Sequence, residues 1–181
     1  KNTALLKGNI SGVNWDNIKV GNKNLRFDYL CICLGSKYEV PLKEQNIVIT
    51  TRASHLKKHH KKLAKSQKVL IIGGGLVGVE LAAEICTHYS NKDITIVHNK
   101  DRLIERNTLK AIKYADKLFR KNGVNIIYQE QVLEPKNGGY ITDKGTHIET
   151  DLTFLCRGIK SNHEPLKKNF TLDKHNYLVV N

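Results

Sequence analysis

An apolar run that leads directly into a glycine-rich turn constrains the fold more than any other feature of this sequence. Residues 69–72 are continuously apolar, and residues 73–78 read Gly-Gly-Gly-Leu-Val-Gly. Apolar residues then recur at helical spacing over residues 79–89, and residues 94–97 form a second apolar run. A strand, a glycine turn, a helix and a second strand within about 30 residues are typical of a βαβ unit with parallel strands.

The glycine spacing fits the GxGxxG pattern of dinucleotide-binding turns. In that pattern Gly73 permits the tight turn, Gly75 lets the backbone approach a pyrophosphate, and Gly78 lets the helix pack closely on the strand. Free amides at the positive end of the helix then face the diphosphate. A glycine turn without a ligand is the alternative, but the position between strand and helix favours a nucleotide site. The residues we assign to it are Gly73, Gly74, Gly75, Leu76, Val77 and Gly78.

The end of the second strand bears on which coenzyme is bound. In NAD-specific sites a carboxylate about 20 residues beyond the glycine turn accepts a hydrogen bond from the ribose 2′-hydroxyl. Counted from Gly78, that position is His98, which is not an acid. The donors that follow suit a 2′-phosphate, although Asp101 is an alternative acceptor. We therefore predict tolerance of NADPH rather than strict use of NADH, with three residues at the coenzyme: His98, Lys100 and Arg102. Lys100 and Arg102 are equally consistent with solvated surface charges.

The remainder of the chain continues the pattern. Thr108 is a candidate N-cap for a second helix that ends at Gly123, and residues 124–128 predict a third parallel strand. A meander over residues 132–150 then leads into an apolar strand at 151–158.

The strand at 151–158 has a counterpart near the start of the chain. Each segment begins with Asp, has Cys five positions later and Gly seven positions later, and follows a meander; the pairs are Asp28 with Asp151, Cys33 with Cys156, and Gly35 with Gly158. We expect residues 29–35 to form a strand buried on both faces, with Cys31 and Cys33 pointing to one side. The sequence then holds the end of one unit and the whole of a second, and we interpret it as a fragment whose first glycine turn lies upstream.

Composition narrows the class of protein. The balance of 30 Lys and Arg against 17 Asp and Glu gives a net charge of +13, which raises nucleic acid as a partner. The one concentrated basic run, residues 54–68, holds no acid and no aromatic residue, so a solvated helix face is favoured over a specific nucleic-acid site. No apolar run is long enough to cross a bilayer. The four cysteines lack metal-binding spacing, which favours no metal, reduced thiols and an intracellular protein.

The order of several motifs along the chain is specific. The run LIIGGGLVGVELAAEI is preceded by FDYLCICLGS and followed by ITIVHNKDRLIE, GVNIIYQEQV and TDLTFLCRGIKSN. In this order they resemble the FAD-dependent pyridine nucleotide-disulfide oxidoreductase superfamily over nearly the whole chain. The GVELAAEI helix and the His in IVHNK are similar to the branch that includes apoptosis-inducing-factor-like, ferroptosis-suppressor-like and type II NADH dehydrogenase proteins.

The resemblance implies both an architecture and an activity. The fold class would be α/β, a doubly wound parallel sheet (a Rossmann-like NAD(P)-binding domain) with an antiparallel meander and flanking pieces of a FAD-binding domain. Residues 1–45 would close the first half of the FAD domain, residues 46–156 would bind NAD(P), and residues 157–181 would return to the FAD domain, with a connector around Pro41. The protein would pass a hydride from NAD(P)H to FAD and on to a quinone or similar acceptor.

The resemblance also implies roles for individual residues. Gly158 would lie near the nicotinamide and Glu80 near the junction of flavin and nicotinamide, although a first-turn Glu is often only a partner of the helix dipole. Three residues would contact FAD, namely Cys33, Leu34 and Gly35, and Leu34 departs from the Thr usual in the family.

Two kinds of alternative stay open. Within the superfamily, the acceptor can be a disulfide, the ascorbyl radical or a ferredoxin instead of a quinone. Outside it, the chain can be a non-catalytic module that binds a nucleotide or DNA. We expect no specific nucleic-acid partner, membrane association only through regions outside this sequence, and a cytoplasmic or mitochondrial location.

Overall fold

The computed structural model describes residues 3–38, 49–136 and 138–180. The chain divides into two compact units, one of Lys1–Lys37 with Ile159–Asn181 and one of Tyr38–Gly158, and each is described by itself. The expected connector around Pro41 and the expected boundary between residues 45 and 46 lie outside the described residues.

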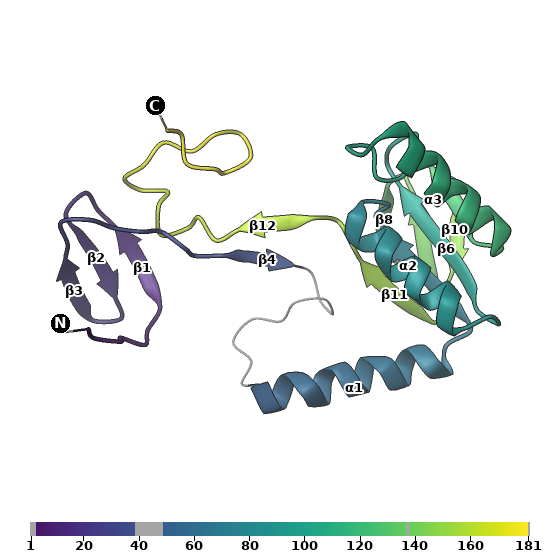
Figure 1. The fold of residues 1–181 in the computed structure, drawn as a ribbon, viewed down its shortest axis with the longest axis horizontal. Helices are drawn as coiled ribbons and strands as arrows, with labels where there is room; N and C mark the ends of the chain where they lie inside the picture. Colours follow the sequence, from purple (N-terminus) through teal and green to yellow (C-terminus); the bar gives the residue numbers. More distant parts are fainter. Residues whose placement is uncertain (1–2, 39–48, 137, 181) are drawn as a thin grey trace. The chain divides into compact units, whose positions relative to one another are not determined.

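The larger unit is built on a four-stranded parallel sheet. In spatial order its strands are β11 (Leu152–Leu155), β5 (Lys68–Ile72), β6 (Asp93–His98) and β7 (Asn125–Tyr128). Helix α2 (Leu76–His88) links β5 to β6, and α3 (Leu109–Lys121) links β6 to β7 (Figure 1). The predicted βαβ unit is therefore confirmed. The helix α2 begins at Leu76, three residues earlier than predicted, because Gly78 lies inside the helix and not in the turn before it.

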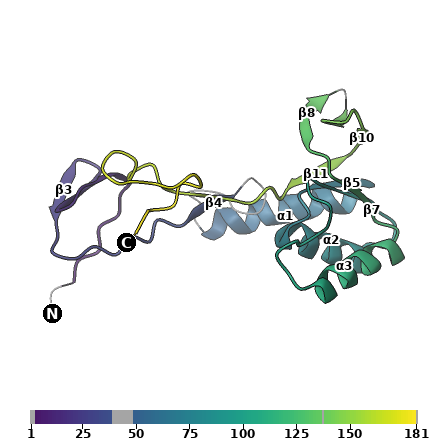
Figure 2. The same ribbon diagram turned by 90° about the horizontal axis from the view of Figure 1, so that it is seen from above.

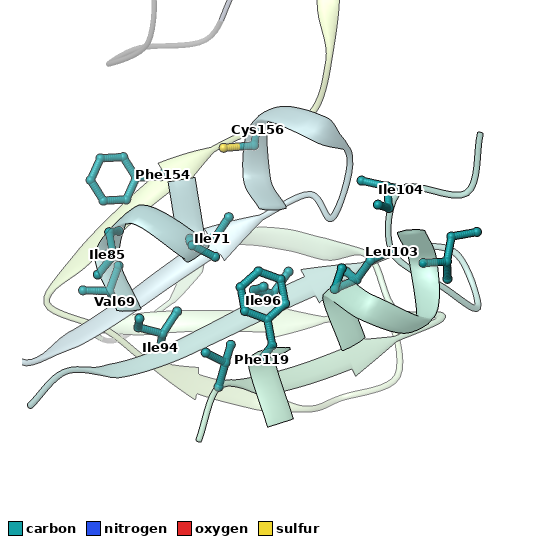
Figure 3. Packing of buried hydrophobic residues seen from close by; sticks show 14 residues of the cluster. Val69, Ile71, Ile85, Ile94, Ile96, Leu103, Ile104, Phe119, Phe154 and Cys156 are labelled. Carbon is teal, nitrogen blue, oxygen red and sulfur yellow. The ribbon is translucent and has the colours of Figure 1, made fainter. Parts of the chain in front are cut away.

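Both faces of this sheet are covered. Figure 2 shows α2 and α3 on one face and an antiparallel meander on the other, formed by β8 (Val132–Lys136), β9 (Gly139–Thr142) and β10 (His147–Glu149). Side chains of a strand alternate between its faces. Val69 and Ile71 accordingly join the cluster beneath the helices, whereas Leu70 and Ile72 join the cluster beneath the meander (Figure 3 shows the first). This burial on both sides explains the continuous apolar run in β5, and the predicted α/β fold class is confirmed.

The ends of α3 follow the expected capping chemistry. Thr108 is the N-cap, and its side chain accepts a hydrogen bond from the Ala111 backbone N–H, with 3.4 Å between the two atoms. The helix gives way at Gly123, whose φ of +70° suits glycine. Between these ends Phe119 is fully buried against the sheet.

Most of the basic run, residues 54–65, lies on α1 (Ile49–Lys65). Residues 53–58 are exposed, and among the described hydrophobic residues of this helix Leu63 packs against the core beneath α2 and α3. The prediction of a solvated helix face is confirmed for these residues. Among the described helices, none has the length and apolar character that a membrane span requires.

The smaller unit holds an antiparallel sheet of β1 (Ile10–Val13), β2 (Asn17–Val20) and β3 (Lys23–Arg26), together with β4 (Ser36–Tyr38) paired to β12 (Ile159–Ser161). The expected strand at 29–35 is wrong. Tyr29 is 95% exposed, and Cys31 and Cys33 are exposed as well. No strand in the described part of the chain pairs with this segment, whereas β11 has β5 beside it; an apolar run without a pairing partner forms no sheet.

The two repeated segments nevertheless share their final backbone turn. Gly35 has a φ of +67° and Gly158 a φ of +95°, values that favour glycine. The carboxylate of Asp151 begins the second segment by accepting hydrogen bonds at 2.8 Å from the backbone N–H groups of both Gln67 and Lys68. It thereby joins the start of β11 to the start of β5.

We predict that Asp151→Asn lowers thermal stability at neutral pH. The N–H groups of Lys68 and Gln67 lower the pKa of the Asp151 carboxyl, so its ionised form stabilises the fold. A carboxyl with a lowered pKa in the folded state contributes stability above its unfolded pKa, about 3.9, and loses it as the pH falls through the folded value.

The measurement is the melting temperature of both proteins from pH 7 down to about pH 3; the gap between them should stay constant at neutral pH and narrow as the pH falls below the unfolded pKa. Asp93→Asn is the matched control, because Asp93 begins the neighbouring strand and its carboxylate accepts no hydrogen bond from the described residues. An equal loss in the two variants, or a gap independent of pH, contradicts the role of Asp151.

Candidate functional site

Three segments meet at the carboxyl edge of the parallel sheet. They are the glycine turn after β5, the loop of residues 99–107 after β6, and residues 156–158 after β11. The Gly73 N–H donates to the Val97 carbonyl at 2.8 Å, and the Cys156 N–H donates to the Ile72 carbonyl at the same distance. Ligands of open α/β sheets bind outside this edge, so the geometry places the candidate site here.

Two of the glycines are required by packing alone. Gly73 has a φ of +116°, and a Cβ built on it would lie 2.4 Å from the carbonyl oxygen of Cys156. A Cβ on Gly78 would lie 1.9 Å from the carbonyl oxygen of Gly73. No side chain fits at either position, so α2 can approach the turn only if both residues are glycine.

Gly75 is different, because it faces open space. It is the N-cap residue of α2, and a Cβ built on it would meet nothing within 4 Å. The next two residues, Leu76 and Val77, are 58% and 38% exposed. Their backbone N–H groups lie in the first turn of a helix, where no helical carbonyl precedes them. Backbone donors without a helical partner at the positive end of a helix, with a residue lacking a side chain beside them, can receive an anionic group.

Gly74 packs against the loop that follows β6. A Cβ on it would lie 2.5 Å from Cδ2 of Leu103 and 2.9 Å from Cγ of His98. The backbone of the same residue is also engaged, because the Ile104 N–H donates to the Gly74 carbonyl at 2.8 Å. Figure 3 shows Leu103 at this end of the sheet, between Ile96 and Ile104. The loop after β6 is thus fixed against the glycine turn.

The residues predicted to set coenzyme choice have different surroundings. His98 ends β6 and is 7% exposed, and its Nε2 lies 3.4 Å from a carboxylate oxygen of Glu105. Arg102 donates to Asp101 from Nε at 3.0 Å and from Nη2 at 2.7 Å, which lowers the pKa of the Asp101 carboxyl. Lys100 is exposed. Glu105 was not among the residues predicted from the sequence. The one hint of it in the sequence is that position 98, where an NAD site usually has an acid, holds a histidine.

Gly158 and Glu80 are both exposed. Gly158 follows β11 at the carboxyl edge. Glu80 lies in the second turn of α2, because the helix begins at Leu76; its expected first-turn position is therefore wrong. Cys156 beside Gly73 is buried, and burial raises the pKa of its thiol to about 11, which keeps it protonated at neutral pH.

The residues expected to contact FAD lie in the smaller unit. Cys33 and Gly35 are exposed and Leu34 is half-buried. The Asn162 side chain donates to the Leu34 carbonyl at 2.8 Å, and the Asn162 backbone N–H donates to the Gly35 carbonyl at 3.3 Å. These bonds use backbone carbonyls, so they do not depend on the replacement of Thr by Leu. Within the described residues, no group of three or more His, Cys, Asp or Glu side chains is placed to hold a metal ion.

Curated relatives match almost the whole of this chain. It is 32% identical over 178 residues to ferroptosis suppressor protein 1 of Mus musculus, covering 91% of this chain and 48% of the relative. It is 29% identical over 198 residues to apoptosis-inducing factor homolog A of Dictyostelium discoideum, covering 94% of this chain and 48% of the relative. The chain thus spans about half the length of these relatives.

Solved structures share the fold. A water-forming NADH oxidase from Lactobacillus brevis bound to NADH matches with a TM-score of 0.72 and 21% identity, over 92% of this chain and 40% of that one. A ferredoxin reductase from Rhodopseudomonas palustris matches with a TM-score of 0.72 and 14% identity, over 90% of this chain and 43% of that one. The family model described as pyridine nucleotide-disulphide oxidoreductase matches residues 2–181. The chain therefore belongs to the pyridine nucleotide-disulphide oxidoreductase family.

Proposed function

We propose that this chain supplies the nicotinamide-coenzyme site of an FAD-dependent oxidoreductase that passes a hydride from NAD(P)H to the flavin. The observation that carries the proposal is the open N-terminus of α2, where a Cβ on Gly75 would meet nothing within 4 Å and where Leu76 and Val77, whose N–H groups lie in the first turn, are exposed residues. A dinucleotide pyrophosphate fits this position because it needs backbone donors and close approach without a side chain in the way. Family membership supports the same coenzyme.

The residues of this chain would bind and orient, while the cofactors carry the redox chemistry. The N–H groups of Leu76 and Val77 would donate to the pyrophosphate, and Gly158 would lie at the nicotinamide. Lys100 would be an exposed donor toward the adenosine end, and Arg102, which is paired with Asp101, would have only its remaining N–H groups for the same purpose. When bound, NAD(P)H supplies the hydride and FAD accepts it.

Contacts to the flavin would involve other residues of this chain. Cys33, Leu34 and Gly35 would contact FAD, and Glu80 would lie near the junction of the two cofactors. These placements rest on the resemblance to the family, since the FAD residues and the glycine turn belong to different units.

The identity of the molecule that takes electrons from the flavin is a separate part of the proposal. We propose a quinone or a similar small molecule, on the basis of the resemblance to the apoptosis-inducing-factor-like branch. A ferredoxin and a disulfide are the competing acceptors, because a ferredoxin reductase and a flavoprotein disulfide reductase from Escherichia coli share the fold. A cytoplasmic or mitochondrial location belongs to the same proposal.

We predict that Gly75→Ala weakens NADH binding about tenfold, or about 1.4 kcal/mol, by placing a methyl group where the pyrophosphate must approach. The fold should persist, because the added Cβ meets nothing within 4 Å. Calorimetric titration with NADH measures the affinity, and a thermal melt verifies folding. Gly12→Ala is the matched control, since its Cβ also meets nothing within 4 Å. Unchanged NADH affinity in a folded Gly75→Ala protein contradicts the site.

We further predict that flavin-loaded protein containing this sequence is bleached by NADH or NADPH under anaerobic conditions. The flavin absorbance should return when a short-chain quinone is added, because the quinone takes the electrons. Stopped-flow absorbance follows both steps. Failure of both coenzymes to bleach the flavin overturns the oxidoreductase proposal. Reoxidation by a ferredoxin or a disulfide substrate, but not by a quinone, overturns only the choice of acceptor.

A further inference from the structure

A carboxylate reaches the end of β6 from outside the strand. An NAD-selective site needs an acid where β6 ends, and His98 occupies that position. The structure brings Glu105 there instead: its Oε2 lies 3.4 Å from Nε2 of the buried His98. The acid that the strand lacks is therefore supplied by the loop that follows it.

The loop that carries Glu105 is held in a defined shape. Ile104 has a φ of +41°, a left-handed conformation that a β-branched residue adopts only where its surroundings impose it. Two hydrogen bonds hold the backbone of Ile104 in this conformation. The Ile104 N–H donates to the Gly74 carbonyl at 2.8 Å, and the Asn107 N–H donates to the Ile104 carbonyl at 2.8 Å. Leu103 is fully buried next to Gly74. These contacts turn the chain back, so that Glu105 is fixed relative to the glycine turn.

Glu105 is also available to a ligand. Its side chain is 37% exposed, against 8% for His98. A hydrogen bond from its own backbone N–H lowers the pKa of the Glu105 carboxyl, so the group is ionised at neutral pH. His98 is one neighbour of this carboxylate: its Nε2 lies 3.4 Å from Oε2, and its proximity also lowers the pKa of the Glu105 carboxyl. A carboxylate has several acceptor positions, so this one contact leaves Glu105 able to accept a hydrogen bond from a ligand.

The other charged groups at this edge are less suited to select a coenzyme. Asp101, the alternative acceptor, already receives two hydrogen bonds from Arg102. The same pair engages the Arg102 guanidinium, and His98 is buried. Lys100 and Arg106 are the remaining exposed cations of this loop that could receive a 2′-phosphate, and Arg106 lies close enough to Glu105 to lower the pKa of its carboxyl.

We infer that Glu105 accepts a hydrogen bond from the adenosine ribose 2′-hydroxyl of NADH and repels the 2′-phosphate of NADPH, so that the site prefers NADH. The inference rests on the proposed function, since it assumes a nicotinamide dinucleotide at the glycine turn. It assigns the selectivity to a residue beyond the strand and reverses the preference that the donors at 98–102 indicate by themselves.

The test is the affinity of the whole 181-residue chain for NADH and for NADPH, measured separately by calorimetry in the unchanged protein and in Glu105→Gln. Loss of the negative charge should lower the ratio of NADH to NADPH affinity by about tenfold or more, through weaker NADH and stronger NADPH binding. Glu84→Gln is the matched control, because Glu84 forms an exposed pair with His88, also at 3.4 Å, in the last turns of α2. It should leave the ratio unchanged.

The outcomes separate the inference from the proposed function. Binding of neither coenzyme to the unchanged protein overturns the proposed function, and the inference falls with it. Binding of both coenzymes with the same ratio in the unchanged protein and in Glu105→Gln overturns the inference alone. A preference for NADPH that disappears in Lys100→Gln or in Arg106→Gln also overturns it and supports that residue as the phosphate ligand. Glu105→Ala is a second neutral variant, and a thermal melt of each protein ensures that only folded variants are compared.

Discussion

The close approach of α2 to the turn after β5 is the constraint on which the rest of the larger unit depends. A Cβ on Gly78 would lie 1.9 Å from the Gly73 carbonyl oxygen, and a Cβ on Gly73 would lie 2.4 Å from the Cys156 carbonyl oxygen. Because neither residue has a side chain, α2, the glycine turn and the end of β11 can pack against one another. Any larger residue at position 73 or 78 would clash. The first turn of α2 consequently opens at the carboxyl edge of the sheet, which is where an anionic ligand gains most from a helix end.

Packing in the core fixes the positions of the strand and the loop that form the site. Alternate residues of β5 pack beneath the helices and beneath the meander, so the strand that carries the glycine turn is buried on both faces. The loop after β6 is joined to the same turn through Leu103 and Ile104, the first fully buried and the second hydrogen-bonded to Gly74. The backbone that would hold a pyrophosphate and the loop that carries Glu105 are therefore one rigid arrangement.

The sequence predicted those parts of the fold whose signals are local. The apolar run at 69–72, the glycine spacing, the Thr108 cap and Gly123 each depend on a few adjacent residues, and the structure confirms the elements they indicate. The strand expected at 29–35 failed because an apolar run indicates strand propensity but not the presence of a neighbour to pair with. Glu105 was missed because its position depends on the left-handed backbone of Ile104. Isoleucine rarely adopts this conformation, so the sequence does not predict it. His98 was predicted to contact the coenzyme, but it is buried, and its burial depends on Gly74 and Leu103, which belong to separate segments.

The central claim is that a nicotinamide dinucleotide binds at the open N-terminus of α2. Amide NMR spectra of the uniformly ¹⁵N-labelled chain, recorded during a titration with NADH, test it most directly because each backbone N–H reports its own surroundings. The account predicts saturable shifts for the amides of Gly75, Leu76 and Val77, with smaller shifts at Glu105 and Gly158. Saturable shifts confined to the lysines of α1, or an unchanged spectrum at the glycine turn with NADH in large excess, would contradict it.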